Sequence, residues 1–185
     1  ENLLKEGVAK EKLFMVGDIM VDSLLFNKDK AAKLNVASSL GLENKKYALL
    51  TLHRPSNVDS KENMEKIFAA LAVISKEIPI VFPAHPRTKK NLETMFSDSR
   101  FTIHDSRLVL IDPLGYLEFL NLMINCRLLL TDSGGVQEET TVLGIPCLTL
   151  RDTTERPITL THGTNTLVWT DTNKIIKEAK NILAG

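Results

Sequence analysis

The segment from residue 128 to residue 139 joins a strand-like run to a glycine-rich turn that could hold an anion. Leu128 to Thr131 is apolar or β-branched, as expected for a buried strand, and Val136 to Leu143 has the pattern of a short helix. Ser133-Gly134-Gly135 lies between them, where the helix should begin. A helix N-terminus carries unpaired N–H groups and a partial positive charge, and glycines let a phosphate approach those groups closely.

Two adjacent glutamates follow this turn and offer a second kind of contact. Glu138 and Glu139 are separated by about 100° around a helix, so only one of them can face a ligand beyond the strand. A carboxylate there could accept hydrogen bonds from two ribose hydroxyls. In the alternative interpretation, Ser-Gly-Gly is only a tight turn, and the glutamates complement the helix dipole in its first turn. These residues alone leave the two interpretations equally open.

Basic side chains follow two further strand-like runs. His53-Arg54 comes directly after Tyr47 to Thr51, and His85-Pro86-Arg87 follows Ile78 to Phe82. An imidazole and a guanidinium could neutralise a diphosphate or stabilise a leaving group. One such pair alone is more often merely solvated, but its repetition after the next strand favours a functional role.

Three other features have a structural interpretation beside a functional one. Arg151 to Pro157 holds two arginines, two threonines and two acids, which fits either ligand contacts or a loop with internal salt bridges. His162 to Asn165 fits a turn better than a sugar contact. Phe119 lies in a helical run, where its spacing favours the hydrophobic core over stacking on a base.

Strand-like runs alternate with helical patterns, which predicts an α/β fold with a parallel sheet covered by helices on both faces. The predicted strands are 47–51, 78–82, 108–111, 128–130, 147–150 and 166–169. The main predicted helices are 63–76, 89–96, 116–124, 136–143 and 173–183. Because polar clusters follow four of the strands, they should meet at the carboxyl edge of the sheet, where doubly wound folds bind ligands.

Composition argues against several classes of function. The 23 basic and 23 acidic residues cancel, so nothing favours nucleic acid or an anionic membrane as a partner. No apolar run is long enough to cross a membrane, and the charged start does not resemble a signal peptide. We therefore expect a cytoplasmic protein.

Metal and cofactor chemistry are not expected either. Cys126 and Cys147 lie at or in apolar runs without a second ligand nearby, which favours buried, inert thiols. The four histidines are scattered and give no zinc signature: His53, His85, His104 and His162. The GxGxxG, GxxxxGK[ST] and GxSxG motifs are missing from the sequence. The interpretation that remains is a diphosphate-bearing ligand, a nucleotide sugar by preference, held by basic loops and one helix N-terminus.

Four motifs together resemble the non-hydrolysing UDP-N-acetylglucosamine 2-epimerases. In chain order they are Thr51 to Asp59, Pro83 to Thr88, Asp132 to Glu139, and Arg151 to Pro157 followed by Gly163-Thr164-Asn165. The combination of Asp-Ser-Gly-Gly-x-Gln-Glu-Glu with Arg-Asp-x-Thr-Glu-Arg-Pro is highly specific. The resemblance spans nearly the whole chain and implies the C-terminal, Rossmann-like half of a two-domain glycosyltransferase-B fold.

The resemblance implies an isomerase of polysaccharide biosynthesis that needs no cofactor or metal. UDP-N-acetylglucosamine and UDP-N-acetylmannosamine would interconvert by elimination and readdition of UDP. His53 would be the catalytic residue of this half and assist departure of the diphosphate, Glu139 would bind the ribose, and Phe119 would lie near the uracil. The further substrate-binding residues would be His85, Ser133, Gly134, Gly135 and Arg156. The acids and bases at C2 would belong mostly to the other half.

The resemblance also divides the chain and implies its partners. Residues 1–15 would form an interdomain lead-in helix, and residues 16–185 the C-terminal UDP-binding domain. The partners would be UDP-N-acetylglucosamine or UDP, the N-terminal domain of the same protein, and a second copy in a homodimer of the intact protein. The fragment alone should lack activity, because half of the cleft is missing. The alternatives are a hydrolysing UDP-N-acetylglucosamine 2-epimerase and a nucleotide-sugar-binding domain without catalysis.

Overall fold

Six parallel strands form one sheet in the order β3-β2-β1-β4-β5-β6. The computed structural model describes residues 2–96 and 107–185, so His104 lies outside the described residues. The strands are β1 Ala48–Thr51, β2 Ile80–Pro83, β3 Leu108–Ile111, β4 Leu128–Thr131, β5 Cys147–Thr149 and β6 Asn165–Leu167. Every neighbouring pair is parallel, which confirms the predicted α/β class.

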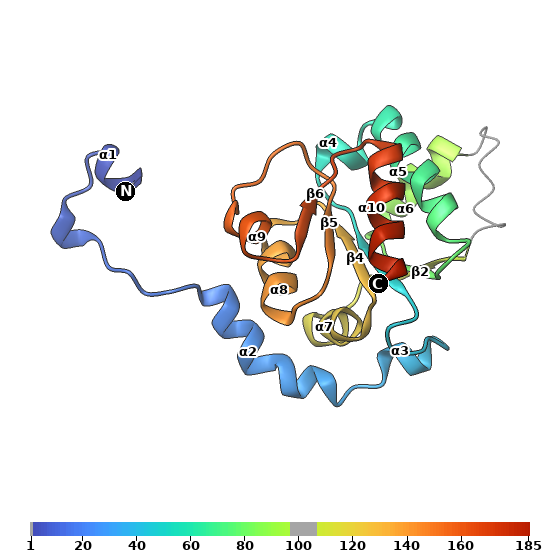
Figure 1. Ribbon diagram of the computed structural model, residues 1–185, viewed down its shortest axis with the longest axis horizontal. Coiled ribbons are helices and arrows are strands. Elements are labelled where there is room, and N and C mark those ends of the chain that lie inside the picture. Colours follow the sequence, from blue (N-terminus) through green and yellow to red (C-terminus); the bar gives the residue numbers. More distant parts are fainter. Residues whose placement is uncertain (1, 97–106) are drawn as a thin grey trace.

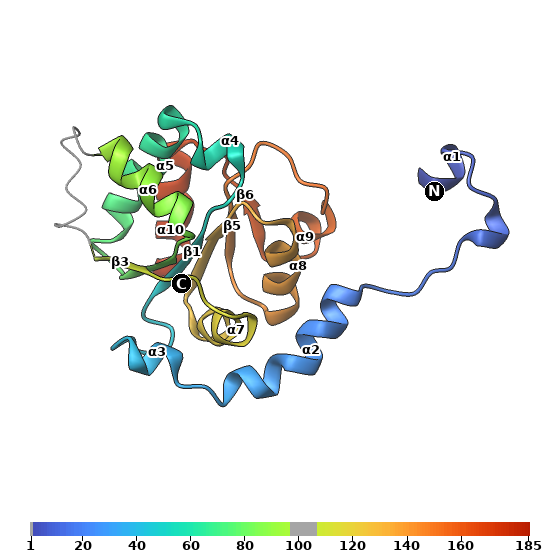
Figure 2. The same cartoon turned by 180° about the vertical axis from the view of Figure 1, so that it is seen from behind.

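Helices cover both faces of this sheet, as Figure 1 and Figure 2 show from opposite sides. The longer helices are α2 Ile19–Ala32, α5 Lys61–Ile74, α6 Pro86–Phe96, α7 Tyr116–Asn125, α8 Gly134–Leu143 and α10 Thr172–Ala184. The short ones are α1 Asn2–Lys5, η1 Lys10–Lys12, α3 Val36–Ser39, α4 Pro55–Val58 and α9 Ile158–Thr161. Helices α5, α6 and α10 lie on one face and α7 and α8 on the other, with α2 packed outside α7. Among the described residues, no helix has the length and hydrophobicity needed to cross a membrane.

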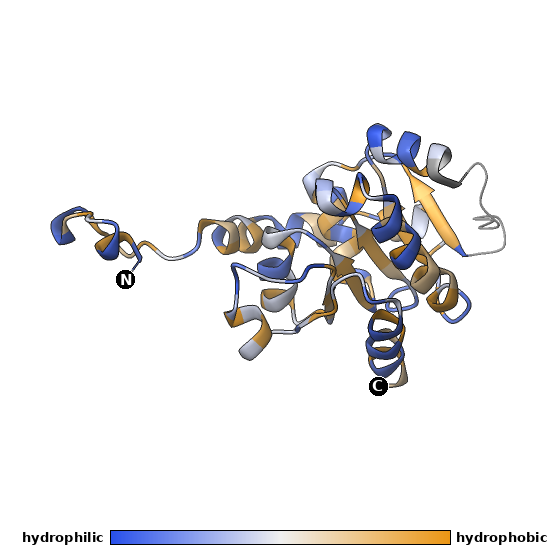
Figure 3. Cartoon of the chain, turned by 90° about the horizontal axis from the view of Figure 1, so that it is seen from above, coloured by the Kyte–Doolittle hydropathy of each residue, from blue (hydrophilic) through white to orange (hydrophobic). Residues whose placement is uncertain are grey.

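Alternate residues of each strand supply two separate cores. On β1, Ala48 and Leu50 pack with α5 and α10, whereas Leu49 packs with α7 and α3, and all three are fully buried. Strand β4 repeats this alternation, and Figure 3 shows the orange strands between helices whose outer turns are largely blue. Burial on both faces explains why the strands are continuous apolar runs. Each fully buried leucine stabilises the fold by about 1.5–3 kcal/mol.

Side-chain caps set where several helices begin. Ser60 Oγ accepts a hydrogen bond from Asn63 N at the start of α5, and Asp171 Oδ1 accepts one from Lys174 N at the start of α10. Helix α8 ends at Gly144, whose φ of 69° favours glycine. The predicted end of this helix at Leu143 is thus confirmed. Four of the five predicted helices, α5, α6, α8 and α10, begin one to three residues before the predicted positions, whereas α7 begins at the predicted Tyr116.

The start of the chain, residues 2–18, is an extended N-terminal arm rather than the continuous helix expected over residues 1–15. Helix α1 ends at Lys5 and Gly7 follows with a φ of 84°, a backbone conformation that interrupts a helix. The exposed fractions of Phe14, Met15 and Val16 are 79%, 98% and 85%. Figure 1 shows that this arm leads away from the sheet and its helices. The arm therefore carries apolar side chains that the described residues leave uncovered.

Candidate functional site

The candidate site lies where the chain changes direction in the sheet. Strands β1 and β4 are adjacent and parallel, but the chain leaves β1 toward β2 on one side and β4 toward β5 on the other. Such a switch point opens a crevice at the carboxyl ends of the two central strands. His53 follows β1 there, and Asp132 to Gly135 follows β4. The sheet order thus brings together two of the polar clusters that the sequence placed after strands.

Asp132 connects the ends of these two strands. Its carboxylate is fully buried and accepts hydrogen bonds from His53 N at 3.2 Å, Arg54 N at 3.0 Å and Asn57 Nδ2 at 3.1 Å. It also lies 2.9 Å from His53 Nδ1. Because a carboxylate can only accept, the proton of the imidazole sits on Nδ1, and Nε2 is left for a ligand. More than half of the His53 side chain is exposed, so a ligand can reach it.

The electrostatics of this pair favour a charged imidazole. The hydrogen bond to Asp132 raises the pKa of His53 above its usual value, against the opposing effect of partial burial. Burial works against ionisation of Asp132, but hydrogen bonds from His53, Arg54 and Asn57 outweigh it and lower the pKa of the carboxyl. The arrangement therefore favours the protonated form of His53 at the rim, a form that suits an anionic leaving group.

The N-terminus of α8 presents free backbone donors beside His53. Ser133 caps the helix weakly, with its Oγ 3.5 Å from Val136 N. Within the described part of the chain, the N–H groups of Gly134 and Gly135 have no hydrogen-bond partner, as expected for the first turn of a helix. A Cβ atom at Gly134 would lie 2.5 Å from Glu155 Oε1. The unpaired N–H groups fit the predicted anion site, whose occupant remains a prediction.

The two glutamates of α8 diverge, as the helical spacing predicts. Glu138 pairs with Arg156 Nε at 2.6 Å, whereas Glu139 Oε1 accepts a hydrogen bond from Tyr116 Oη at 2.9 Å. Because α8 begins at Gly134, no acid lies in its first turn. The alternative that both glutamates complement the helix dipole there is therefore wrong. Burial raises the pKa of both carboxyls, and the Tyr116 hydrogen bond opposes this at Glu139.

The loop from Arg151 to Pro157 closes over the start of α8. Arg151 pairs with Glu155 at 2.6 Å within the loop, so the interpretation as an internally salt-bridged loop is correct for this pair. Glu155 also pairs with Arg54 at 3.5 Å, which ties the loop to the end of β1. The Arg156–Glu138 pair ties it to α8. The loop is therefore a third wall of the site.

Two predicted ligand residues lie further from this centre. His85 is exposed after β2, at the same edge of the sheet, and its Nδ1 accepts a hydrogen bond from Arg87 N at 3.3 Å. Phe119 is half-buried on α7, one turn after Tyr116, and packs against the core beneath α7 and α8. The core interpretation of Phe119 is thus confirmed, and its contact with a uracil stays a prediction.

Sequence reasoning missed two residues that organise the site, Asp132 and Tyr116. Asp132 stood in the recognised motif, but its partners come from β1, and only the sheet order brings them near. Tyr116 reaches Glu139 from a helix 23 residues earlier. The expected turn at His162 is confirmed, and Asn165 is buried with its Nδ2 on Gln137 O and Thr141 Oγ1.

The remaining titratable groups give no metal centre within residues 2–96 and 107–185. Cys126 and Cys147 are fully buried, and burial raises the pKa of each thiol to about 12. This confirms their interpretation as inert core residues.

Comparison with known proteins shows where this architecture belongs. A family model described as UDP-N-acetylglucosamine 2-epimerase matches residues 1–185. The chain belongs to this family. A relative of that name from Methanocaldococcus jannaschii is 44% identical over 194 residues, which cover 98% of this chain and 51% of the relative. The chain thus spans about half the length of the curated relatives it matches, and the predicted family is confirmed.

Solved structures place the same architecture in two groups of proteins. The M. jannaschii UDP-GlcNAc 2-epimerase in complex with UDP-GlcNAc and UDP matches with a TM-score of 0.86 and 43% identity, covering 100% of this chain and 51% of that one. Escherichia coli heptosyltransferase WaaC with ADP matches with a TM-score of 0.51 and 12% identity, over 75% of this chain and 45% of that one. The second match concerns the fold alone. Together they confirm the expected Rossmann-like half of a glycosyltransferase-B fold.

Proposed function

We propose that this chain is the UDP-binding half of a cytoplasmic enzyme that interconverts UDP-N-acetylglucosamine and UDP-N-acetylmannosamine. One observation carries the proposal. At the switch point of the sheet, His53 is held by the buried Asp132, and the unpaired N–H groups of Gly134 and Gly135 follow Asp132 by two and three residues. A cationic imidazole and a helix N-terminus together suit a diphosphate.

These groups act on the leaving group in the proposed reaction. The bond between the anomeric carbon of the sugar and the diphosphate oxygen breaks, and negative charge develops on that oxygen. The contact with Asp132 favours the protonated form of His53, which would stabilise this charge and can supply a proton to it. The Gly134 and Gly135 N–H groups and the Ser133 hydroxyl hold the other phosphate oxygens.

The remaining contacts would hold the nucleoside and close the site. Glu139, fixed by Tyr116, is the proposed acceptor for the ribose hydroxyls. Phe119 on the same helix as Tyr116 is the proposed neighbour of the uracil. Arg156 and His85 are proposed to complete the surroundings of the diphosphate and sugar. The proton transfers at C2 are assigned to the N-terminal domain of the intact protein.

The N-terminal arm supports this division of labour. Phe14, Met15 and Val16 are 79–98% exposed, an arrangement that leaves apolar side chains for another surface to cover. We assign the arm to the contact with the N-terminal domain, at the boundary between residues 1–15 and 16–185. The intact protein is further proposed to form a homodimer, which light scattering after size-exclusion chromatography would measure.

Product analysis of the intact protein tests the proposed reaction. Incubated with UDP-N-acetylglucosamine in D₂O, it should form UDP-N-acetylmannosamine with deuterium at C2, while the 185-residue chain alone forms none. Free N-acetylmannosamine with UDP as the only products would instead identify a hydrolysing enzyme. UDP binding without any turnover of the intact protein would identify a binding domain, and either result would overturn the proposal.

A further inference from the structure

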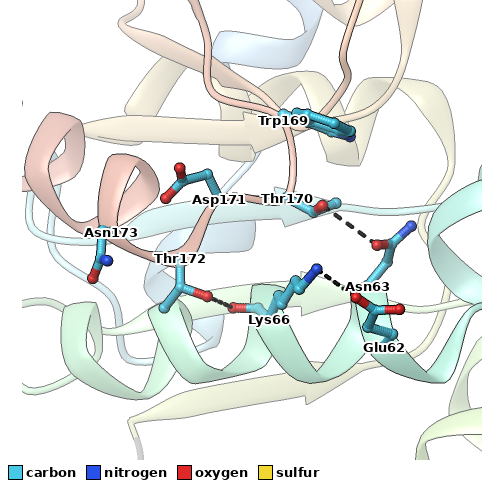
Figure 4. A pocket seen from close by; sticks show the side chains of 8 residues that line it. All are labelled: Glu62, Asn63, Lys66, Trp169, Thr170, Asp171, Thr172 and Asn173. Atoms are coloured by element: carbon cyan, nitrogen blue, oxygen red, sulfur yellow. Dashed lines mark hydrogen bonds and ion pairs between the residues drawn. The ribbon is translucent and has the colours of Figure 1, made fainter.

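A second hollow of about 530 Å³ opens between the first turns of α5 and α10 (Figure 4). Its walls come from Glu62, Asn63 and Lys66 on α5 and from residues 169–173. The volume falls in the range of about 300–1,000 Å³ that small-molecule sites occupy. Trp169 and Asn63 also line a neighbouring hollow of about 360 Å³ that contains Arg54 and Arg151. The second hollow therefore adjoins the candidate site without sharing its arginines.

Trp169 has a backbone conformation that its own packing does not explain. Its φ is 55°, a value that bulky residues rarely adopt, and 58% of the residue is exposed. Lys45 is the other non-glycine residue with a positive φ in the described part of the chain. Lys45 Nζ donates to Ile124 O at 2.7 Å and Cys126 O at 2.9 Å, contacts that account for its position. The Trp169 side chain makes no hydrogen bond within the described residues, yet the turn presents its ring to solvent.

The charges and polar groups around the indole suit an uncharged ligand. Lys66 Nζ lies 2.6 Å from Glu62 Oε1, so the single cation of the wall is already paired. Asp171 accepts from Lys174 N as the cap of α10. Thr170 donates to Asn63 Oδ1 at 3.4 Å, Asn63 Nδ2 donates to Ser56 O at 2.9 Å, and Thr172 donates to Lys66 O at 2.9 Å. The amide of Asn173, which faces the same space, has no hydrogen bond within the described residues. A phosphate would find no free positive charge here.

We propose that this hollow binds an uncharged carbohydrate, with a sugar ring stacked on the indole of Trp169. The C–H groups on one face of a sugar ring are weakly positive and match the negative face of an aromatic ring. Hydroxyls around that ring would exchange hydrogen bonds with the amide of Asn173 and with the second amide hydrogen of Asn63, whose first one is bonded to Ser56 O. Because the contacts lie outside the proposed UDP site, this inference does not depend on the proposed reaction.

Trp169 also serves as an intrinsic fluorescence probe, because it is the one tryptophan of the sequence. Titration with methyl N-acetylglucosaminide, methyl glucoside and chitobiose should shift or quench its fluorescence saturably, whereas sorbitol, which has no ring face, should not. Comparable affinity for the monosaccharides and chitobiose would indicate a free sugar as the ligand. Higher affinity for chitobiose would indicate the end of a glycan. Saturation-transfer NMR should show the same sugars in contact with the protein.

Variants at this position separate binding from folding. Trp169→Gly removes the ring and fits the positive φ, so the melting temperature should stay the same or rise while sugar affinity falls by about tenfold or more. Trp169→Phe keeps a smaller ring and should retain part of the NMR signal. Equal sugar binding by Trp169→Gly and the unsubstituted chain would overturn the proposal. So would a fluorescence response to UDP but to none of the sugars.

Discussion

His53 Nδ1 lies 2.9 Å from Asp132 Oδ1, and this contact joins the ends of the two central strands of the sheet. The pair fixes the imidazole with Nε2 directed away from the carboxylate. It also raises the pKa of His53 and so favours a positive charge near the start of α8. The proposed handling of the UDP leaving group depends on this one relationship.

Replacing the buried carboxylate of Asp132 should lower the pKa of His53 while the chain still folds. In Asp132→Asn we expect the pKa of His53 to fall, because its main stabilising partner loses its charge. NMR titration of the imidazole measures this. The loss of unfolding free energy should be about 1–3 kcal/mol, typical of a disturbed buried hydrogen-bond network. The matched control is Asp152→Asn, at an exposed residue of a loop. An unchanged His53 pKa in Asp132→Asn would contradict the assignment of Asp132 as the partner that raises this pKa.

The same pair predicts a pH dependence of stability. Because the folded-state pKa of His53 lies above the unfolded value of about 6.5, its stabilisation is complete below that value and is lost as pH rises through the folded pKa. The side chain is more than half exposed, so the loss should stay below about 1 kcal/mol. Urea unfolding of the chain and of His53→Gln across this range measures it. A slope that persists in His53→Gln would assign the effect to another group.

Glu139 should determine nucleoside binding rather than phosphate binding. Glu139→Gln keeps a partner for Tyr116 but removes the charge that we assign to the ribose hydroxyls. We expect UDP affinity to fall by about tenfold, which corresponds to about 1.4 kcal/mol, while inorganic diphosphate affinity stays unchanged. Isothermal titration calorimetry compares the two ligands, with Glu65→Gln on the exposed side of α5 as control. Equal losses for both ligands would refute the ribose contact.

Alanine at Gly134 and alanine at Gly163 should have opposite effects on stability and on UDP affinity. At Gly134 the new Cβ would meet only the carboxylate at the far end of the Glu155 side chain, which can rotate away, and the first turn of a helix accepts alanine. Gly134→Ala should therefore keep its stability and lose UDP affinity.

At Gly163 the Cβ would lie 2.5 Å from the backbone oxygen of Thr159, which cannot move freely. Gly163→Ala should lose about 1–3 kcal/mol of unfolding free energy. Thermal unfolding and calorimetry of both variants provide the comparison. Normal UDP affinity in Gly134→Ala would mean that no ligand approaches that amide.

Local patterns predicted the six strands and five of the six longer helices, because burial on both faces of a sheet leaves continuous apolar runs. They missed α2, whose 14 residues bury only Leu24 and Ala31. They placed helix starts less well, since α8 begins at its Ser133 cap rather than at the first apolar residue, Val136. The prediction of a helix over residues 1–15 was also wrong, because α1 ends at Lys5.

The sequence predicted those parts of the site that lie within a single motif. Clusters after strands located the correct edge of the sheet, but the order of strands decides which clusters meet. Asp132 and His53 are 79 residues apart, and their contact requires β1 beside β4. The strained Trp169 gave no signal in the sequence, because a positive φ is a property of the folded turn.

Mapping UDP on the chain by amide chemical shifts tests the central claim most directly. The largest changes on addition of UDP should fall on Gly134, Gly135 and His53. The amino edge of the sheet, where Lys45, Arg107 and Arg127 line a separate basic hollow, should be unaffected. Shifts confined to that amino edge, with none at the start of α8, would contradict the account.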